Sequence, residues 1–177
     1  MLRNEAATRI DLIDPALRAR GWTGDLVREE ITAGAIDIVG GEAVRRGKRA
    51  DYVLRVRPVP EGQPVAVAVL EAKAEHLPPA HGLQQGKGYA AAKRLNVPFV
   101  VASNGHQFVL YDAFSGQTSS PRPMVELPTP NDLRARYEVT KGFALTDELA
   151  RPLAQPYLQG EGVRRYYQDA AIRAVFE

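Results

Sequence analysis

The segment VAVAVLEAK at residues 65–73 constrains the fold more than any other part of the chain. Its first six residues are all apolar, and only its last residues carry charge. A continuous apolar run of this length, preceded by a loop rich in proline and glycine, is typical of a buried strand. Such a strand needs neighbouring strands and a covering layer of helices. The sequence therefore predicts an α/β domain with this strand near the centre of its sheet.

Strand and helix patterns alternate around this central segment. Residues 51–56, DYVLRV, predict a second strand, and the Pro- and Gly-rich loop between the two strands favours an antiparallel hairpin. Strand, strand, helix, strand and strand thus form the expected core. The other expected elements are a helix over 83–95, strands within 97–104 and 107–113 joined by the Asn104-Gly105 turn, a strand within 31–39, and short helices over 130–137 and 146–152.

An amphipathic pattern over residues 3–20 predicts a helix before the sheet. Asp14 followed by Pro15 inside this stretch favours two short helices, because proline is tolerated at the first helical position after a capping residue. Gly21 is a helix-stop residue, and we expect Trp22 to pack beneath that end.

Composition excludes several classes of protein. A chain of 177 residues with 45% hydrophobic and 25% charged residues has the make-up of one globular domain. It contains no cysteine, which excludes disulfides, a thiolate zinc site and a cysteine nucleophile. It has neither a signal-peptide pattern nor an apolar run of membrane-spanning length, so we expect a cytoplasmic protein with no membrane partner. The net charge of +2 says nothing decisive about nucleic acid, and the basic run at 45–49 is typical of a solvated turn.

Charged residues lie at the ends of the two hairpin strands. Asp51 opens the first strand, and Glu71 and Lys73 close the second. Side chains alternate along a strand, so Glu71 and Lys73 face the same side, and Asp51 can approach them from the neighbouring strand. An acid and a lysine at this spacing are common by chance and are often only solvated. The buried strand before them and the acid on its neighbour favour a site.

Two carboxylates and one ammonium group suit the hydrolysis of a phosphodiester. Two carboxylates can hold Mg²⁺ and leave water molecules in its remaining positions. Such an ion lowers the pKa of a bound water and offsets the charge of the reacting phosphate. The lysine can orient that water or stabilise the developing negative charge.

The predicted helix that follows carries a second pattern, with Gln85 and Tyr89 four residues apart on one helix face. An amide and a phenol in line suit contacts to a DNA backbone or to an unpaired base. The alternative is that Tyr89 is a partly buried core residue. Gly86 and Gly88 weaken a helix, and the close approach of another backbone is one reason for them.

Together these residues resemble a known family. Asp51, the Glu71-Ala72-Lys73 triplet and the Gln85–Tyr89 pattern resemble the PD-(D/E)xK nuclease fold with its QxxxY extension. That extension occurs in the RecB-like branch and in the restriction subunits of type I restriction–modification enzymes. Residues 4–22 resemble the opening helix of those subunits, and residues 97–112 resemble the strand, Asn-Gly turn and strand that follow. The resemblance implies a restriction-endonuclease-like α/β fold, with a mixed central sheet flanked by helices.

The resemblance also implies roles for individual residues. Asp51 and Glu71 match the metal-binding acids, for which Mg²⁺ is the expected ion and Mn²⁺ a substitute, and Lys73 matches the catalytic lysine. Gln85 and Tyr89 match the pair that supports DNA binding and cleavage. One further match is Glu5, which corresponds to an acid sometimes found near the metal. Ala50 stands where the literal pattern has proline.

The last residues resemble a different part of those subunits. The Arg164–Gln168 segment, followed by Ala171 and Ile172, is similar to the RxYQxxAI segment that opens a superfamily 2 helicase motor. The resemblance implies that Gln168 contacts the adenine of ATP. We therefore expect a nuclease domain over residues 1–145, a linker and the start of a motor over residues 146–177, and a longer parent chain.

The leading hypothesis is a Mg²⁺-dependent DNA endonuclease domain of a type I restriction subunit, which acts on double-stranded DNA. The resemblance implies gating by an ATP-driven translocase and assembly with modification and specificity subunits. Two alternatives stay open: a catalytically silent module for DNA or subunit docking, and a structure-specific nuclease of repair or recombination.

Overall fold

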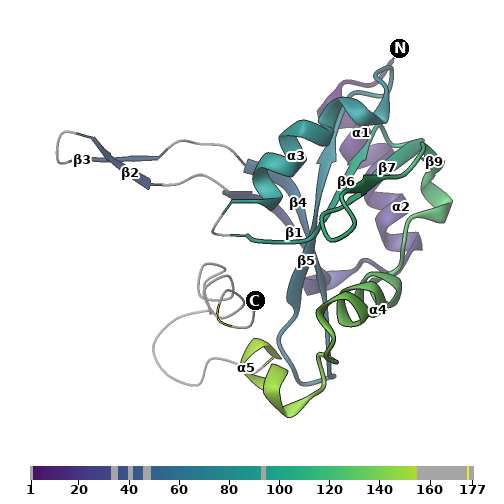
Figure 1. The fold of residues 1–177 in the computed structure, drawn as a ribbon. Coiled ribbons are helices and arrows are strands. Elements are labelled where there is room, and N and C mark those ends of the chain that lie inside the picture. The colour runs from purple at the N-terminus through teal and green to yellow at the C-terminus, as the bar shows by residue number, and fades with distance from the viewer. Residues whose placement is uncertain are drawn as a thin grey trace.

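The computed structural model describes residues 2–32, 36–39, 42–45, 49–92, 95–154 and 175. Within them a central sheet lies between helical layers, as Figure 1 shows. Its strand order is β1-β4-β5-β6-β7-β8, with β9 paired to β7. The strands of this sheet are β1 (Val27–Thr32), β4 (Arg49–Val56), β5 (Val65–Ala72), β6 (Phe99–Ser103), β7 (Gln107–Asp112), β8 (Gln117–Thr118) and β9 (Arg122–Pro123).

Helices cover both faces of this sheet (Figure 1). The α-helices are α1 (Glu5–Thr8), α2 (Asp14–Ala19), α3 (Leu83–Ala90), α4 (Pro130–Lys141) and α5 (Arg151–Ala154), and a π-helical segment, η1 (Arg9–Ile13), joins α1 to α2. Short 3₁₀ turns occupy Gly24–Leu26, Pro79–Gly82, Met124–Glu126 and Glu148–Ala150. Strands β2 (Ile36–Val39) and β3 (Glu42–Arg45) form a separate antiparallel pair that extends away from the central sheet.

The central strand and its hairpin are confirmed. All eight residues of β5 are buried, because β4 and β6 flank the strand and helices cover its two faces. β4 pairs with β5 antiparallel, whereas β6 pairs with β5 parallel, as expected when α3 connects two strands. The sheet is therefore mixed, and the α/β prediction is confirmed.

Two apolar layers lie on opposite faces of the sheet. The larger layer joins the first helices and α4 to one face, and includes Ile13, Trp22 and Leu70. The smaller layer lies beneath α3 and includes Val69 and Tyr89. Since side chains alternate along a strand, Glu71 shares the α3 face with Val69.

The first helical stretch is continuous, where the sequence favoured two separate helices. The π segment carries the chain through Pro15, with the Asp14 N–H bonded to the Arg9 carbonyl five residues earlier. The stop at Gly21 is confirmed, since its φ is +84° and the Trp22 N–H bonds back to the Leu17 carbonyl.

Two other helices differ in length from the predictions. α3 ends at Ala90 rather than near residue 95. Beyond its end the Val97 N–H bonds back to the Ala90 carbonyl, and Pro98 follows. α4 continues to Lys141 rather than residue 137, between a capping box at Thr129 and a left-handed Gly142. No helix in the described part of the chain has both the length and the apolar character needed to cross a membrane.

Some predictions fall outside the described residues. These are the turn at Gly40-Gly41, most of the basic run at 45–49, and the segment that contains Gln168. The expected boundary between residues 145 and 146 stays a prediction.

Candidate active site

Four predicted site residues meet where β4 begins and β5 ends, beside α1. Lys73 Nζ lies 3.1 Å from Glu71 Oε1 and 3.4 Å from Glu5 Oε2, so α1 contributes a second carboxylate to this lysine. The Asp51 carboxylate accepts a hydrogen bond from the Ala72 N–H, with Oδ2 at 2.8 Å from the nitrogen. The structure therefore brings Glu5, Asp51, Glu71 and Lys73 together from three separate elements.

Glu71 is the most deeply buried charged residue of this group. The residue is 1% exposed, and its Oε2 has no hydrogen-bond partner in the described part of the chain. Burial, followed by the nearby Asp51 carboxylate, raises the pKa of Glu71 to about 7, although Lys73 opposes the shift. A buried acid with one unbonded oxygen is costly unless the site binds a proton or a cation.

The other two charged groups respond to the same surroundings. Burial also raises the pKa of Asp51, although the Ala72 N–H and nearby cations oppose it. Burial lowers the pKa of Lys73, but the Glu71 and Glu5 carboxylates outweigh it and leave that pKa above its ordinary value. Lys73 therefore keeps its positive charge at neutral pH.

Two glycines allow the start of α3 to pack over Glu71. A Cβ atom at Gly82 would lie 2.9 Å from Glu71 Cγ, and one at Gly86 would lie 2.5 Å from Val100 Cγ1. At Gly86 the close neighbours are the side chains of Val100 and Glu71 and not another backbone, as the sequence suggested, while a Cβ at Gly88 would meet no atom within 4 Å. Glycine at 82 and 86 is thus part of how the chain buries this acid.

Gln85 and Tyr89 are bonded to each other on α3. Gln85 Nε2 donates to the Tyr89 hydroxyl at 2.9 Å. Tyr89 is 7% exposed, and its ring belongs to the apolar layer beneath α3. Burial raises the pKa of Tyr89, and the Glu71 and Asp51 carboxylates add to this shift. The Tyr89 hydroxyl therefore interacts electrostatically with the two central acids. The ring is a core residue, and a DNA contact through its hydroxyl stays a prediction.

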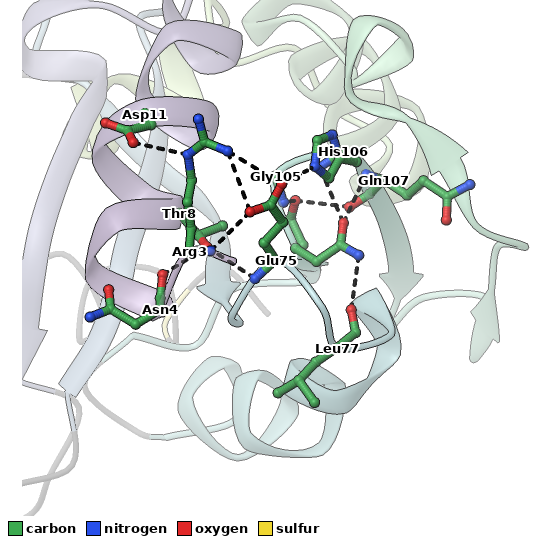
Figure 2. A network of polar contacts seen from close by, with 11 residues as sticks. Arg3, Asn4, Thr8, Asp11, Glu75, Leu77, Gly105, His106 and Gln107 are labelled. Atoms are coloured by element: carbon green, nitrogen blue, oxygen red, sulfur yellow. Dashed lines mark hydrogen bonds and ion pairs between the residues drawn. The ribbon is translucent and has the colours of Figure 1, made fainter. Parts of the chain in front are cut away.

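A network of polar contacts fixes α1 beside the site (Figure 2). The Glu75 carboxylate accepts hydrogen bonds from the backbone N–H of Arg3 at 3.0 Å and from its guanidinium at 3.3 Å. The Glu75 N–H donates to Thr8 Oγ1, and His106 Nε2 lies 3.0 Å from Glu75 Oε1. The Arg3 N–H and then His106 lower the pKa of Glu75 to about 2. Arg3 and Thr8 flank Glu5, so their bonds to Glu75 hold Glu5 in position.

Sequence reasoning did not single out Arg9, which the structure places at the edge of the site. Its Nη1 lies 3.7 Å from Asp51 Oδ1, and its Nη2 lies 3.4 Å from Glu29 Oε2. Its Nε donates to the Tyr52 hydroxyl at 3.3 Å. An arginine on a helix gives no local signal of such contacts, because they depend on how the helix packs on the sheet.

Two carboxylates, Asp51 and Glu71, are the groups that could share a metal ion here. In the described ranges, no set of three or more histidine or acidic side chains is arranged to hold one. Glu5 reaches Lys73, and its role as a metal ligand stays a prediction.

Comparison with known proteins identifies relatives. No family model matches the chain. It is 34% identical over 172 residues to the Escherichia coli type I restriction enzyme EcoAI endonuclease subunit, in an alignment that covers 92% of this chain. The chain is a homologue of the HsdR subunit of type I restriction enzymes. It spans 20% of the length of that E. coli subunit.

A solved structure of an HsdR fragment supports the fold. The chain matches the fragment structure of a putative HsdR subunit of a type I restriction enzyme from Vibrio vulnificus YJ016, with a TM-score of 0.74 and 32% identity. The match covers 99% of this chain and 32% of that chain. The mixed sheet flanked by helices is thus shared with an HsdR fragment, as the resemblance predicted.

Proposed function

We propose that this HsdR homologue is a DNA endonuclease domain that hydrolyses phosphodiester bonds at Asp51, Glu71 and Lys73. The observation that carries the proposal is the buried Glu71, whose Oε2 has no partner in the described residues, next to Asp51 and Lys73. A carboxylate is not retained in such surroundings for stability, because an apolar residue would cost less. The relative's name, an endonuclease subunit, supports this chemistry.

The donor set fits a hard divalent cation such as Mg²⁺, with Mn²⁺ as a substitute. Glu71 Oε2 and the outer oxygen of Asp51, Oδ1, are the atoms that would hold it, since Asp51 Oδ2 already accepts the Ala72 N–H. When bound, such an ion supplies a water of lowered pKa and offsets charge on the phosphate.

The remaining residues bind and orient the substrate in this proposal. Lys73 keeps a positive charge beside Glu71 and stabilises the negative charge that develops on the phosphate oxygens. Gln85 and Tyr89 offer polar groups from α3 to the DNA backbone or to an unstacked base. Glu5 restrains the Lys73 ammonium from the other side.

The activity of the whole parent protein is also a proposal, because the chain spans only a fifth of its E. coli relative. We propose that double-stranded DNA is the substrate, and that cleavage is gated by an ATP-driven motor in the parent subunit. Gln168 would contact ATP there, and the modification and specificity subunits would supply recognition of the DNA sequence.

The test is plasmid cleavage by the intact subunit in its assembled complex, with Mg²⁺ and ATP. Lys73→Ala is expected to abolish cleavage and to leave ATP hydrolysis and DNA binding nearly unchanged, because the lysine acts in the transition state. Lys141→Ala, which changes a lysine on α4, is the matched control. Cleavage at the wild-type rate by Lys73→Ala would contradict a catalytic role for Lys73, and loss of ATP hydrolysis in this variant would show that its defect is not confined to the chemical step. Absence of cleavage by the wild-type complex would favour the silent docking module.

A further inference from the structure

Each of the two central acids has a cation of its own. Lys73 pairs with Glu71 at 3.1 Å, and Arg9 pairs with Asp51 at 3.7 Å. The Arg9 side chain is 17% exposed and contacts groups on both β4 and β1. Its guanidinium also lies over the Tyr52 ring, 4.9 Å from the centroid. Arg9 is therefore held at the site by several contacts.

The π segment explains why Arg9 points to this place. Arg9 begins the segment and Asp14 follows it, five residues later, and both contact the Tyr52 hydroxyl. In a regular α-helix, residues five apart diverge by about 140° around the axis, so they do not share a partner easily. The wider π turn brings residues five apart onto one side. The local helix geometry thus places Arg9 beside Asp51.

The orientation of Asp51 does not depend on Arg9. Asp51 Oδ2 is already fixed by the Ala72 N–H at 2.8 Å, whereas Arg9 lies beyond hydrogen-bond distance of Oδ1. Arg9 therefore acts on Asp51 through its positive charge and not through a hydrogen bond. A fixed positive charge close to a carboxylate attracts the acid and repels any further cation that approaches it.

We propose that Arg9 acts through Asp51 as a fixed counter-charge, and lowers the affinity of the Asp51–Glu71 pair for a divalent cation. This inference rests on the proposed metal-dependent function. A cation that enters between the two acids meets Lys73 on one side and Arg9 on the other. Glu29, which is 61% exposed, shares Arg9 with Asp51 and so weakens this repulsion.

The experiment is a titration of the 177-residue chain with Ca²⁺, by calorimetry and without DNA, so that no cleavage is involved. Arg9→Met removes the charge and keeps an apolar stem, and it is expected to bind Ca²⁺ about threefold more tightly or better. Arg9→Lys keeps the charge and is expected to stay near the wild-type affinity. Arg18→Met, on the exposed side of α2, is the matched control, and thermal unfolding shows that each variant is folded.

A second variant is expected to change the Ca²⁺ affinity in the opposite direction, and it leaves the buried contacts of Arg9 in place. Glu29→Gln frees Arg9 for Asp51, so its Ca²⁺ affinity is expected to fall about twofold or more. Glu61→Gln removes an exposed acid in the loop before β5 and controls for general charge. Unchanged or weaker binding by Arg9→Met, or tighter binding by Glu29→Gln, overturns the inference while wild-type binding leaves the proposed metal site standing. If neither wild type nor Arg9→Met binds Ca²⁺, both proposals are wrong.

Discussion

Glu71 combines two properties that rarely occur together, near-complete burial and an ionisable group with an unbonded oxygen. Its neighbours add to the cost, since Asp51 is a second acid on the same side of the sheet. Among the residues that the structure describes, Lys73 is the cation that pairs with Glu71, and it is shared with Glu5. At the scale of single residues, the site is therefore the part of the molecule where stability is sacrificed.

The raised pKa of Glu71 predicts a pH-dependent stability difference. Between the ordinary value of 4.5 and about 7, the folded chain holds a proton that the unfolded chain has released. Its stability therefore falls as the pH rises through this window, an effect that Glu71→Gln removes. The free energy of unfolding of Glu71→Gln minus that of wild type is expected to increase by roughly 1–3 kcal/mol between pH 5 and pH 8. Urea unfolding at both pH values measures it.

The control for this measurement is Glu61→Gln, which changes an exposed acid in the loop before β5. If the free energies of unfolding of Glu71→Gln and wild type differ by the same amount at both pH values, the raised pKa of Glu71 is contradicted. The comparison uses metal-free buffer, because a bound cation would stabilise only the wild-type carboxylate.

Two substitutions of Tyr89 distinguish the structural role of its ring from the proposed functional role of its hydroxyl. Tyr89→Ala is expected to cost about 3–5 kcal/mol of stability, since the ring is buried beneath α3. Tyr89→Phe keeps the ring and is expected to reduce cleavage with little change in melting temperature. Both quantities are measured on one preparation of the intact subunit. Full cleavage by Tyr89→Phe would mean that the residue serves only the core.

At the scale of elements, α3 is a short helix shaped by what lies under it. Its two inner glycines look equivalent in sequence, but the structure distinguishes them, because only Gly86 approaches the β6 side chain Val100. The local pattern cannot reveal this difference, since it depends on the distance between a helix and a sheet. The early end of α3 has the same kind of cause, because the chain must turn into β6.

This difference predicts opposite effects for two alanine substitutions. Gly86→Ala places a Cβ 2.5 Å from Val100 Cγ1 and is expected to destabilise the chain by about 1–3 kcal/mol. Gly88→Ala meets no atom within 4 Å and is expected to stabilise it by up to about 1 kcal/mol through helix propensity. Thermal unfolding of the two variants and wild type measures the direction of both stability changes. Equal effects would contradict the packing of α3.

The elements that the sequence predicts well are those with local causes. The apolar run of β5, the Asn104-Gly105 turn and the stop at Gly21 each contain their own signal. The π segment and the contacts of Arg9 and Glu75 have none, because they arise where distant segments meet. The grouping of Asp51, Glu71 and Lys73 could be predicted because strand alternation and a hairpin are enough to define it.

At the scale of the whole molecule, the larger apolar layer extends beyond the predicted domain boundary. Ala150 and Leu153 are buried in that layer, and the Gln63 N–H bonds to the Ala154 carbonyl at 2.7 Å. The last described helix therefore packs on the same core as the sheet.

This packing predicts how truncated chains behave. A chain of residues 1–145 is expected to lose at least about 2 kcal/mol of stability relative to one of residues 1–154, the usual cost of deleting a buried leucine. Circular dichroism during heating compares the two. Equal melting temperatures would place the limit of the nuclease domain at residue 145, where the sequence predicts it.

The anchoring of Trp22 also has a consequence for how the chain is made. This is the one tryptophan of the sequence, and its indole N–H donates to the Pro128 carbonyl, 106 residues later. A ribosome adding about 5–20 residues per second needs roughly 5–20 s to cover that distance. The segment that carries Trp22 is therefore synthesised seconds before its Pro128 partner, and the emission of this tryptophan reports when the two segments meet.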